Sequence, residues 1–295
     1  MTFSLSAYFK EKAAFVDDAL LTRWLPAATR DPATLHEAMR YSVTAGGKRV
    51  RPVLVFAAAQ ALGIPDRDVL PIAAALEMIH VFSLIHDDLP AMDDDDYRRG
   101  KPANHVQFGE ATAILAGNAL LVEAFGWMSK FRKNSQISSD VFLMIVEDIA
   151  RACGANGMIG GQFLDIQLQE KGEDEINYPQ LEFLYIRKTG NLILVAITSG
   201  AKLSGATPKQ IKALTQYGEN LGLAFQLVDD ILDMHDNYRG PVKIKKPIFP
   251  PILSLNESRQ RSLELASRAI EALKDFDHRA DPLREIATYV VERKQ

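Results

Sequence analysis

The amino-acid sequence predicts an all-α fold, a single-domain bundle of about ten helices around a deep central cavity. Helical periodicity dominates the 295 residues, and alternating strand patterns are nearly absent. Helix starts are marked where a capping side chain precedes a proline, at Asp31-Pro32, Thr207-Pro208 and Asp281-Pro282. No internal repeat and no convincing interdomain linker divides the chain, so we expect one domain over residues 1–295.

The expected helices follow one another with short interruptions. Segment 32–45 is amphipathic and stops at Gly46-Gly47, segment 52–62 is apolar on most faces, and segment 68–89 ends at Pro90. Further helices are expected over 106–131, 139–152, 155–170, 179–187, 190–203, 208–235, 257–275 and 282–293. The expected interruptions are short enough to be loops on one body, at 92–105, 171–178 and 236–251.

Composition and charge exclude several classes of protein. The chain is 47% hydrophobic and 24% charged, which is typical of a globular protein and not of a disordered chain. Its 34 basic and 38 acidic residues leave a net charge of −4, so we expect no binding to nucleic acid or to an anionic membrane. The single Cys153 excludes an internal disulfide and a multi-cysteine zinc site. No apolar run approaches the ~18 residues of a membrane span, and no signal peptide is recognisable, so we expect a cytoplasmic protein.

An acidic run at residues 87–96, DDLPAMDDDD, is the first candidate site. A solvated loop is the ordinary interpretation of such a run, but here Asp87 and Asp88 end the apolar stretch AAALEMIHVFSLIH. Carboxylates at the carboxyl end of a buried helix oppose the helix dipole and need a countercharge. Basic residues follow at once, at Arg98, Arg99 and Lys101. Acid followed by base suits a phosphate bridged by a metal ion.

A second acidic set and a second basic set complete the pattern. In LGLAFQLVDDILDM, offsets of three, four and seven residues place four polar side chains on one helical stripe, Gln226, Asp229, Asp230 and Asp233. Two acidic sets facing a cavity would bind hard cations, and the lack of a calcium-loop pattern favours Mg²⁺ shared with phosphates. The motif GGKRVRP at 46–52 presents Lys48, Arg49 and Arg51. Those cations could be an ordinary helix terminus, or a second anion pocket beside the first.

These motifs together resemble a known family. GGKRVRP, DDLPAMDDDDYRRGKP, GQFLD, RKTG and FQLVDDILD are all typical of the trans-isoprenyl diphosphate synthases, and the sequence is most similar to the bacterial farnesyl diphosphate synthase branch. The resemblance extends from about residue 30 to residue 275. It implies an isoprenoid-synthase-type helical bundle, usually a homodimer, that binds up to three Mg²⁺ ions. It also implies a prenyltransferase, in which an allylic diphosphate ionises and isopentenyl diphosphate adds to the carbocation.

The resemblance also implies roles for individual residues. Asp87, Asp93 and Asp229 would bind Mg²⁺, supported by Asp88 and Asp233. The allylic diphosphate would be held by Arg98, Lys188 and Lys246. The pocket for isopentenyl diphosphate would be formed by Lys48, Arg51, His80 and Arg99. Thr189 and Gln226 would lie near the reacting carbons, with Gln162 and Asp165 on the same wall. The catalytic residues implied are Asp87, Lys188, Thr189, Gln226 and Asp229.

Three positions before Asp87 on the same helix bear on product length and on the site. Ser83 and Phe82 lie four and five residues before Asp87 and would form the cavity floor. A bulky aromatic there goes with a fifteen-carbon product in this family, although plain core packing is the alternative and a twenty-carbon product remains open. His80 lies seven residues before Asp87, so both face the same side of their helix.

The sequence departs from the family pattern after the second acidic set. From Asp233 to KPIFP the path is short, MHDNYRGPVKIK, and a usual Gly-Lys pair is missing, so that Lys243 or Lys245 would stand in. In this family the loop helps to close the site, so its shortening affects closure and the geometry of the third metal site.

Two other functions fit parts of the pattern. A terpene cyclase would not need the second diphosphate pocket of GGKRVRP, His80 and Arg99. A non-catalytic partner subunit would be favoured by loss of an aspartate motif, and both motifs are present.

Overall fold

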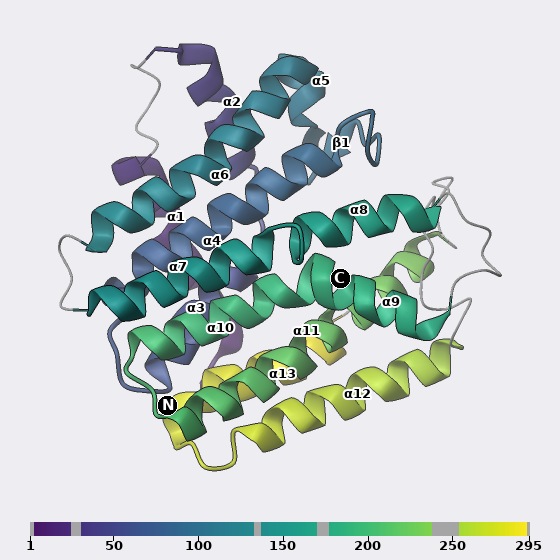
Figure 1. Ribbon diagram of the computed structural model, residues 1–295. Coiled ribbons are helices and arrows are strands. Elements are labelled where there is room, and N and C mark those ends of the chain that lie inside the picture. Colours follow the sequence, from purple (N-terminus) through teal and green to yellow (C-terminus); the bar gives the residue numbers. More distant parts are fainter. Residues whose placement is uncertain (1–2, 25–30, 133–136, 170–176, 238–253, 294–295) are drawn as a thin grey trace. The chain divides into compact units, whose positions relative to one another are not determined.

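The computed structural model describes residues 3–24, 31–132, 137–169, 177–237 and 254–293 (Figure 1). Within these ranges the chain is helical apart from turns and one hairpin, in which strand β1 (Tyr97–Arg98) pairs antiparallel with strand β2 (Lys101–Pro102). The all-α fold expected from the helical periodicity is confirmed.

The chain divides into two compact units. The first comprises Met1–Phe56 and Pro65–Phe142, and the second comprises Ala57–Ile64 and Leu143–Gln295. The single domain expected over residues 1–295 therefore stays a prediction.

Unit 1 is built around one buried helix. The elements that begin in it are α1 (Leu5–Asp18), a π-helical turn (Ala19–Trp24), α2 (Ala33–Val43), α3 (Val50–Gln60), α4 (Asp66–Asp87), α5 (Asn104–Phe108), α6 (Glu110–Arg132) and α7 (Ser139–Cys153). Helix α4 packs along α6, and its side chains from Leu76 to Ile79 are at most 1% exposed. Because α4 is buried along most of its length, the backbone that carries the acidic residues at its carboxyl end is held in place.

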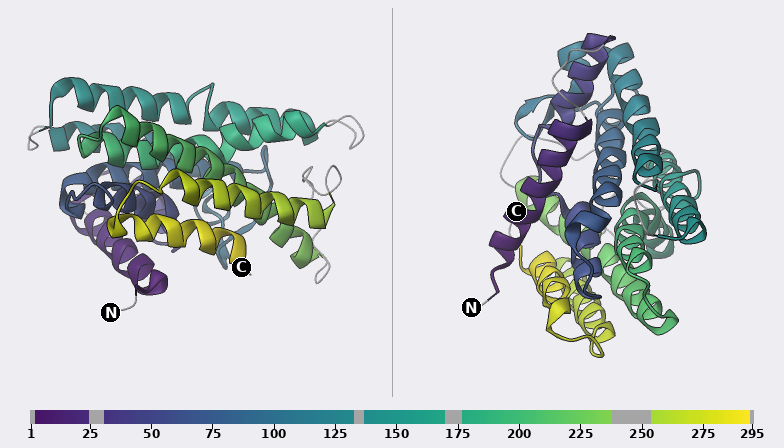
Figure 2. Two further views of the ribbon diagram at one scale, coloured as in Figure 1. Left: turned by 90° about the horizontal axis from the view of Figure 1, so that it is seen from below. Right: turned by 90° about the vertical axis from the view of Figure 1, so that its left-hand side faces the viewer.

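Unit 2 is built around the long helix α11. Its further elements are α8 (Met158–Gln169), α9 (Tyr178–Tyr185), a π-helical turn (Ile186–Gly190), α10 (Asn191–Leu203), α11 (Pro208–Asn237), α12 (Leu255–Ala272), a 3-10 turn (His278–Ala280) and α13 (Asp281–Glu292). Helix α11 packs against α10 on one side and against α12 and α13 on another. The two carboxyl-terminal helices run side by side in both views of Figure 2. Helix α11 can therefore hold its acidic residues against several neighbours.

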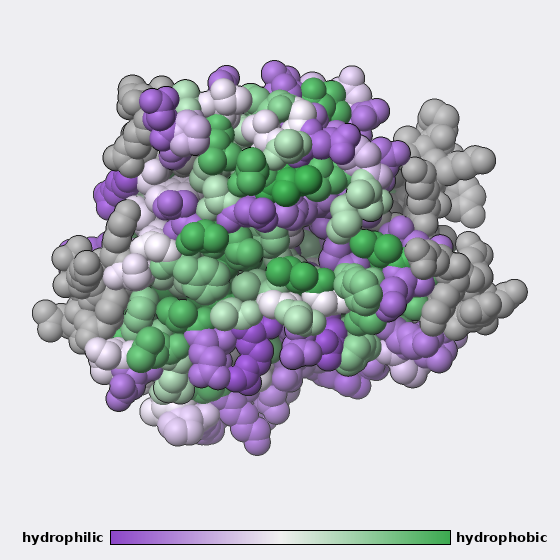
Figure 3. Space-filling view, turned by 45° about the horizontal axis from the view of Figure 1, so that its top comes forward, coloured by the Kyte–Doolittle hydropathy of each residue, from purple (hydrophilic) through white to green (hydrophobic). Residues whose placement is uncertain are grey.

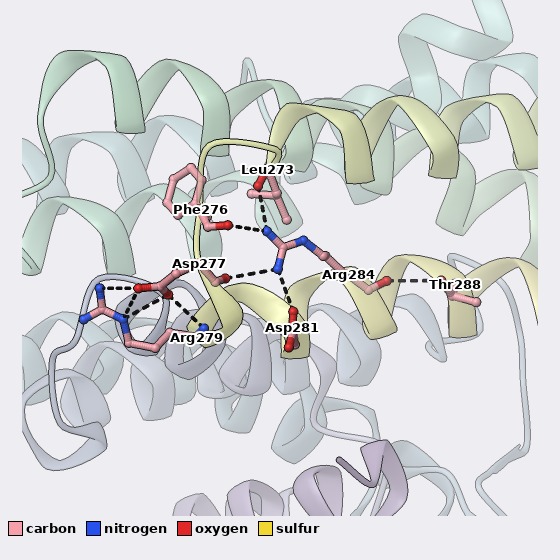
Figure 4. Close-up of polar contacts among 7 residues, drawn as sticks. All are labelled: Leu273, Phe276, Asp277, Arg279, Asp281, Arg284 and Thr288. Atoms are coloured by element: carbon pink, nitrogen blue, oxygen red, sulfur yellow. Dashed lines mark hydrogen bonds and ion pairs between the residues drawn. The ribbon is translucent and has the colours of Figure 1, made fainter. Parts of the chain in front are cut away.

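Arg284 joins the end of α12 to the start of α13 (Figure 4). Its guanidinium donates to the backbone carbonyls of Leu273 at 2.8 Å and Phe276 at 2.7 Å, and to that of Asp277 at 3.1 Å. It also bonds the carboxylate of Asp281 at 2.6 Å. One side chain thus satisfies carbonyls that the helix end leaves without intrahelical partners.

Several sequence expectations differ from the structure in detail. The helix expected over 106–131 is two helices, α5 and α6, separated by Gly109. Helix α1 was not among the expected elements. Thr207 caps α11 as expected, since the Gln210 amide donates to its hydroxyl at 3.3 Å. At the other two Pro-marked starts, α2 is capped by Pro32 and α13 begins at Asp281, so neither acid is the capping residue.

The expectation that no apolar run is long enough to span a membrane is wrong. Two helices have the length and composition, α4 and the Glu110–Ser129 part of α6. The apolar window is 72% buried in α4 and 33% buried in α6. Because a core helix of a soluble protein passes the same test, two such helices are weak evidence for a membrane span.

Candidate active site

The first acidic set folds back over the end of α4. The backbone N–H of Asp93 donates to the carbonyl of Asp87 at 2.9 Å, and that of Asp95 donates to the carbonyl of Asp88 at 3.2 Å. These bonds use carbonyls that the helix end would otherwise leave open. They also bring the backbone of Asp93 next to that of Asp87, the two residues of this set expected to bind Mg²⁺.

Asp88 is more deeply buried than its neighbour Asp87, which is half-buried. It is 2% exposed, and its Oδ1 accepts bonds from Nε of Arg98 at 2.8 Å and from Nη2 of the same side chain. Arg98 reaches it because the hairpin β1–β2 returns the chain toward the helix end, and it also bonds Asp95 at 3.0 Å. Burial raises the pKa of Asp88, and the Arg98 guanidinium opposes that rise. Arg98 therefore acts here as the countercharge of a buried carboxylate.

The GGKRVRP turn and the hairpin form a basic pocket in unit 1. Arg99 donates Nη1 to the carbonyl of Gly46, and a Cβ placed on Gly47 would lie 2.5 Å from Cζ of Arg99. Gly47 has φ of 126°, a conformation that residues with a side chain rarely adopt, and a side chain there would also displace the guanidinium. Lys48 is exposed on the same turn, and Arg51 is half-buried at the start of α3.

His80 lies within the field of this basic pocket. Its pKa is lowered well below the usual value by burial first, and then by the positive charges of four arginines, Arg51, Arg99, Arg49 and Arg98. Its Nδ1 is buried with no hydrogen-bond partner in the part of the chain that the structure describes. The imidazole is therefore neutral at pH 7, among cations that a diphosphate would neutralise. Of the residues expected in this pocket, Arg51 and Arg99 lie close enough to His80 for their charges to lower its pKa.

The second acidic set lies on α11 in unit 2 and does not form one uniform stripe. Asp229 accepts a bond from Nη2 of Arg293 at 2.7 Å, and this arginine also lies over the ring of Phe225 at 4.1 Å. Asp230 is 3% exposed and accepts bonds from the Tyr185 hydroxyl and from Nε2 of Gln226 at 3.1 Å. The expected stripe is thus divided, because adjacent residues of a helix point about 100° apart. Asp229 and Asp230 have separate partners.

Two expected residues of this region cannot be placed. The backbone of Asp233 lies in α11, but its side chain is outside the described residues. Lys246 and the alternatives Lys243 and Lys245 also lie outside them.

The RKTG motif forms a π-helical turn that contacts both the GQFLD helix and α11. Lys188 donates to the buried carboxylate of Asp165, and the hydroxyl of Thr189 donates to Oε1 of Gln226 at 2.8 Å. A Cβ on Gly161 would lie 2.4 Å from the backbone nitrogen of Lys188, so a larger residue would push α8 away from this turn. The structure thus brings the GQFLD, RKTG and FQLVDDILD motifs together within unit 2.

Gln162 adds a polar group to that wall. It is 8% exposed, and neither amide atom of its side chain has a hydrogen-bond partner among the residues that the structure describes. Buried amides are normally hydrogen-bonded, so this one is available to a ligand.

The donor chemistry fits Mg²⁺ bound together with a diphosphate. Asp87 and Asp93, whose backbones are bonded to each other, carry carboxylate oxygens, the ligands that Mg²⁺ prefers. No group of three or more acidic, histidine or cysteine side chains close enough to hold a metal occurs among the described residues. Mg²⁺ commonly takes one or two carboxylates and completes its shell with substrate phosphates and water. The residues present suit such a shared ion rather than a cage made by protein alone.

Three residues at these sites were not found from the sequence. Tyr185 and Arg293 hold the second acidic set, and Glu77 lies behind the basic pocket. Arg49 was expected to project from the GGKRVRP turn, but it is 4% exposed because its guanidinium is bonded to Glu77. A signal existed for one of them, because Glu77 is the only charged residue between Val69 and Ile79. A lone carboxylate in an apolar helix needs a buried cation.

The comparisons with known proteins agree with this geometry. The family model described as polyprenyl synthetase matches residues 32–253. A farnesyl diphosphate synthase from Micrococcus luteus is 42% identical over 287 residues, which are 95% of each chain. A geranylgeranyl diphosphate synthase from Cyanophora paradoxa is 39% identical over 298 residues, 99% of this chain and 97% of its own. The crystal structure of an FPP/GFPP synthase from Zymomonas mobilis matches with a TM-score of 0.87 at 35% identity, over 97% of this chain and 98% of its own. The chain belongs to the polyprenyl synthetase family and is a prenyltransferase.

Proposed function

We propose that the chain condenses isopentenyl diphosphate with dimethylallyl or geranyl diphosphate and that its main product is the fifteen-carbon (E,E)-farnesyl diphosphate. Relatives are named after both fifteen- and twenty-carbon products, so product length rests on residues of this chain. The observation that carries the proposal is the placement of Phe82 on α4.

Phe82, which the proposal takes as the cavity floor, is a buried residue of α4. It is 6% exposed and lies five residues before Asp87, so within two helical turns of the acidic end of α4. Its ring meets the ring of His86 edge-on, with centroids 4.8 Å apart. His86 in turn lies 3.1 Å, through Nε2, from the carbonyl of Ile114 on α6. Because its neighbour is held on the opposite helix, the phenyl ring cannot easily turn away from a growing chain.

The proposed reaction transfers an allylic group from diphosphate to carbon. The allylic C–O bond breaks and its electron pair leaves with the diphosphate. The C=C pair of isopentenyl diphosphate forms the new C–C bond, and a proton then leaves the adjacent carbon. Mg²⁺ at the aspartates, when bound, supplies positive charge that stabilises the departing diphosphate. Lys188, positioned by Asp165, binds the same leaving group, and the basic pocket with Arg51, His80 and Arg99 binds the diphosphate of the second substrate.

A homodimer is also part of the proposal. Helix α6 exposes apolar side chains at Ile114, Leu115 and Val122, which are 42%, 57% and 69% exposed. In Figure 3 hydrophobic side chains gather among polar ones on the face shown. Contiguous exposed apolar surface is typical of an interface. Light scattering of the purified protein tests this part, and a cytoplasmic location stays a prediction from composition.

The test of the reaction is product identification. The purified chain is incubated with Mg²⁺, isopentenyl diphosphate and geranyl diphosphate, and the prenyl products are separated by chain length. We expect a fifteen-carbon product from the unaltered chain and longer products from Phe82→Ala, because the substitution opens the floor. Val81→Ala is the control, since Val81 is also buried on α4 and is not placed at the floor. A twenty-carbon product from the unaltered chain, or unchanged products from Phe82→Ala, would contradict the proposal.

A further inference from the structure

Arg49 is a buried arginine in the otherwise accessible GGKRVRP turn. It is 4% exposed, while its neighbour Lys48 is exposed. Its backbone has φ of 51°, a left-handed conformation that is uncommon for a residue with a side chain. Such a conformation persists when the surroundings hold it in place. The side chain is therefore directed inward by its contacts.

The guanidinium of Arg49 joins three helices of unit 1. Nη1 donates to Oε1 of Glu77 on α4 at 2.7 Å, and Nε donates to Oδ1 of Asp17 on α1 at 2.9 Å. Nη2 donates to the carbonyl of Val43 at the end of α2, at 2.6 Å. The side chains of Arg49 and Glu77 are each 2% exposed, whereas that of Asp17 is 39% exposed. The fork of an arginine suits this arrangement, because a lysine could not reach all three acceptors in fixed geometry.

The positions of Arg49 and Glu77 in the chain connect their ion pair with the basic pocket. Glu77 lies three residues before His80 on α4, so the two side chains share a face of the helix. Arg49 stands between Lys48 and Arg51 in the chain, and Arg99 is bonded to the carbonyl of Gly46 in the same turn. Fixing Arg49 to Glu77 therefore fixes where the turn, and the cations on it, lie relative to His80.

A purely structural role would not require these residue types. A buried ion pair replaced by apolar side chains of similar size often leaves stability unchanged or raises it. Oε2 of Glu77 is buried and has no hydrogen-bond partner among the described residues, so the pair is not optimised for stability alone. An apolar pair would keep the core filled but would not hold the turn in one orientation.

We propose that Arg49, held by Glu77 and Asp17, is a positioning residue that aligns Lys48, Arg51 and Arg99 with His80 for binding the diphosphate of isopentenyl diphosphate. Arg49 does not touch the substrate. The inference rests on the proposed function, because it assumes that this pocket binds isopentenyl diphosphate.

The test compares a double substitution with a matched control. Arg49→Met with Glu77→Leu removes both charges and keeps the volume, so the fold should be retained. We expect KM for isopentenyl diphosphate to rise about tenfold or more, with KM for geranyl diphosphate changed less than about twofold. Calorimetry should show the same weakening for isopentenyl diphosphate binding without turnover. The control is Lys12→Met with Asp66→Leu, a part-buried pair at 2.5 Å between α1 and the start of α4, which should leave both KM values unchanged.

Two further variants separate the possible failures. Arg51→Ala tests the pocket itself, and an unchanged KM for isopentenyl diphosphate in that variant would contradict the proposed function. If Arg51→Ala raises that KM and the double variant does not, the pocket stands and the positioning role is wrong. Should the double variant fail to fold, Arg49→Lys decides, because it keeps the charge and loses the fork. A normal KM for isopentenyl diphosphate in folded Arg49→Lys would overturn the inference, and a raised one with normal KM for geranyl diphosphate supports it.

Discussion

The two acidic sets differ in how their charge is balanced. In unit 1, the buried carboxylate of Asp88 is paired with Arg98, which follows it by 10 residues in the chain. In unit 2, Asp229 is paired with Arg293, 64 residues later, while Asp230 relies on the neutral hydroxyl of Tyr185. The first set therefore brings its countercharge on a local hairpin. The second depends on the packing of helices that are far apart in sequence.

This difference indicates different sensitivities in the two units. A local countercharge forms whenever the hairpin forms, and the positive charges near it are dense, since four arginines act on His80. A distant countercharge requires α13 to be seated, which Arg284 secures at the helix's other end (Figure 4). Each set contains a pair of adjacent aspartates, and the second of each pair, Asp88 or Asp230, is buried with a partner. The first of each pair is more accessible, since Asp87 is half-buried and the side chain of Asp229 is 35% exposed.

The largest expected effect is on turnover, and it tests whether the two accessible aspartates are equivalent. If Asp87 and Asp229 bind Mg²⁺ as proposed, Asp87→Ala and Asp229→Ala should each lower kcat/KM by about 10²-fold or more, because each substitution removes an oxygen ligand of an ion that stabilises the departing diphosphate. The measurement is steady-state condensation of geranyl and isopentenyl diphosphate over a range of Mg²⁺ concentrations. Asp94→Asn, an exposed member of the same run, is the control and should turn over normally. Normal turnover in either alanine variant would remove that residue from the metal assignment.

The second prediction concerns stability and separates the two countercharges. Arg98→Met leaves the carboxylate of Asp88, which is 2% exposed, without its partner, and should lower the free energy of unfolding by about 3 kcal/mol. Arg293→Met should lower it by about 1 kcal/mol or less, because the side chain of Asp229 is 35% exposed and water screens it. Urea unfolding at pH 7 measures both. Arg67→Met, whose side chain is 81% exposed, should show no loss. Equal losses from Arg98→Met and Arg293→Met would contradict the contrast between the units.

The third prediction examines the neutral partner of the second set. Tyr185→Phe removes a hydroxyl that donates to the buried carboxylate of Asp230, and should lower the free energy of unfolding by about 2 kcal/mol. Tyr217→Phe is the matched control, since its hydroxyl donates to the uncharged carbonyl of Leu283 at 2.7 Å and should cost about 1 kcal/mol. A larger loss for Tyr217→Phe would mean that Asp230 does not depend on Tyr185.

The smallest expected effect is a pH dependence from His80, whose pKa is lowered first by burial and then by the positive charge around it in unit 1. The pKa of His80 is lowered well below 6.5, so below that pH the unfolded chain takes up a proton that the folded chain does not. Stability from this group is complete above pH 6.5 and falls as the pH decreases, by at most about 1.4 kcal/mol per pH unit. Unfolding measured between pH 7.5 and 5.5 should show this slope in the unaltered chain and a smaller slope in His80→Asn. Equal slopes would mean that the pKa of His80 is not lowered in the folded chain.

Much of the architecture could be predicted from the sequence because helical periodicity is a local property. The segment expected over 68–89 is α4 at Asp66–Asp87, and that expected over 208–235 is α11 at Pro208–Asn237. The resemblance also led us to expect Thr189 near Gln226, and the two side chains are hydrogen-bonded. Boundaries such as Gly109 were less predictable, because a single residue interrupts an otherwise continuous pattern.

The sequence by itself determined the helices, the acidic and basic motifs, and through their combination the prenyltransferase family. Only the tertiary structure decided which member of each motif is buried. Lys48 and Arg49 are adjacent and similar in charge, yet one is exposed and the other bonds Glu77. Asp229 and Asp230 are identical residues with different partners. The reason is physical, because a charged residue's state depends on which distant groups the folded chain brings within hydrogen-bond distance, and no local pattern records that distance.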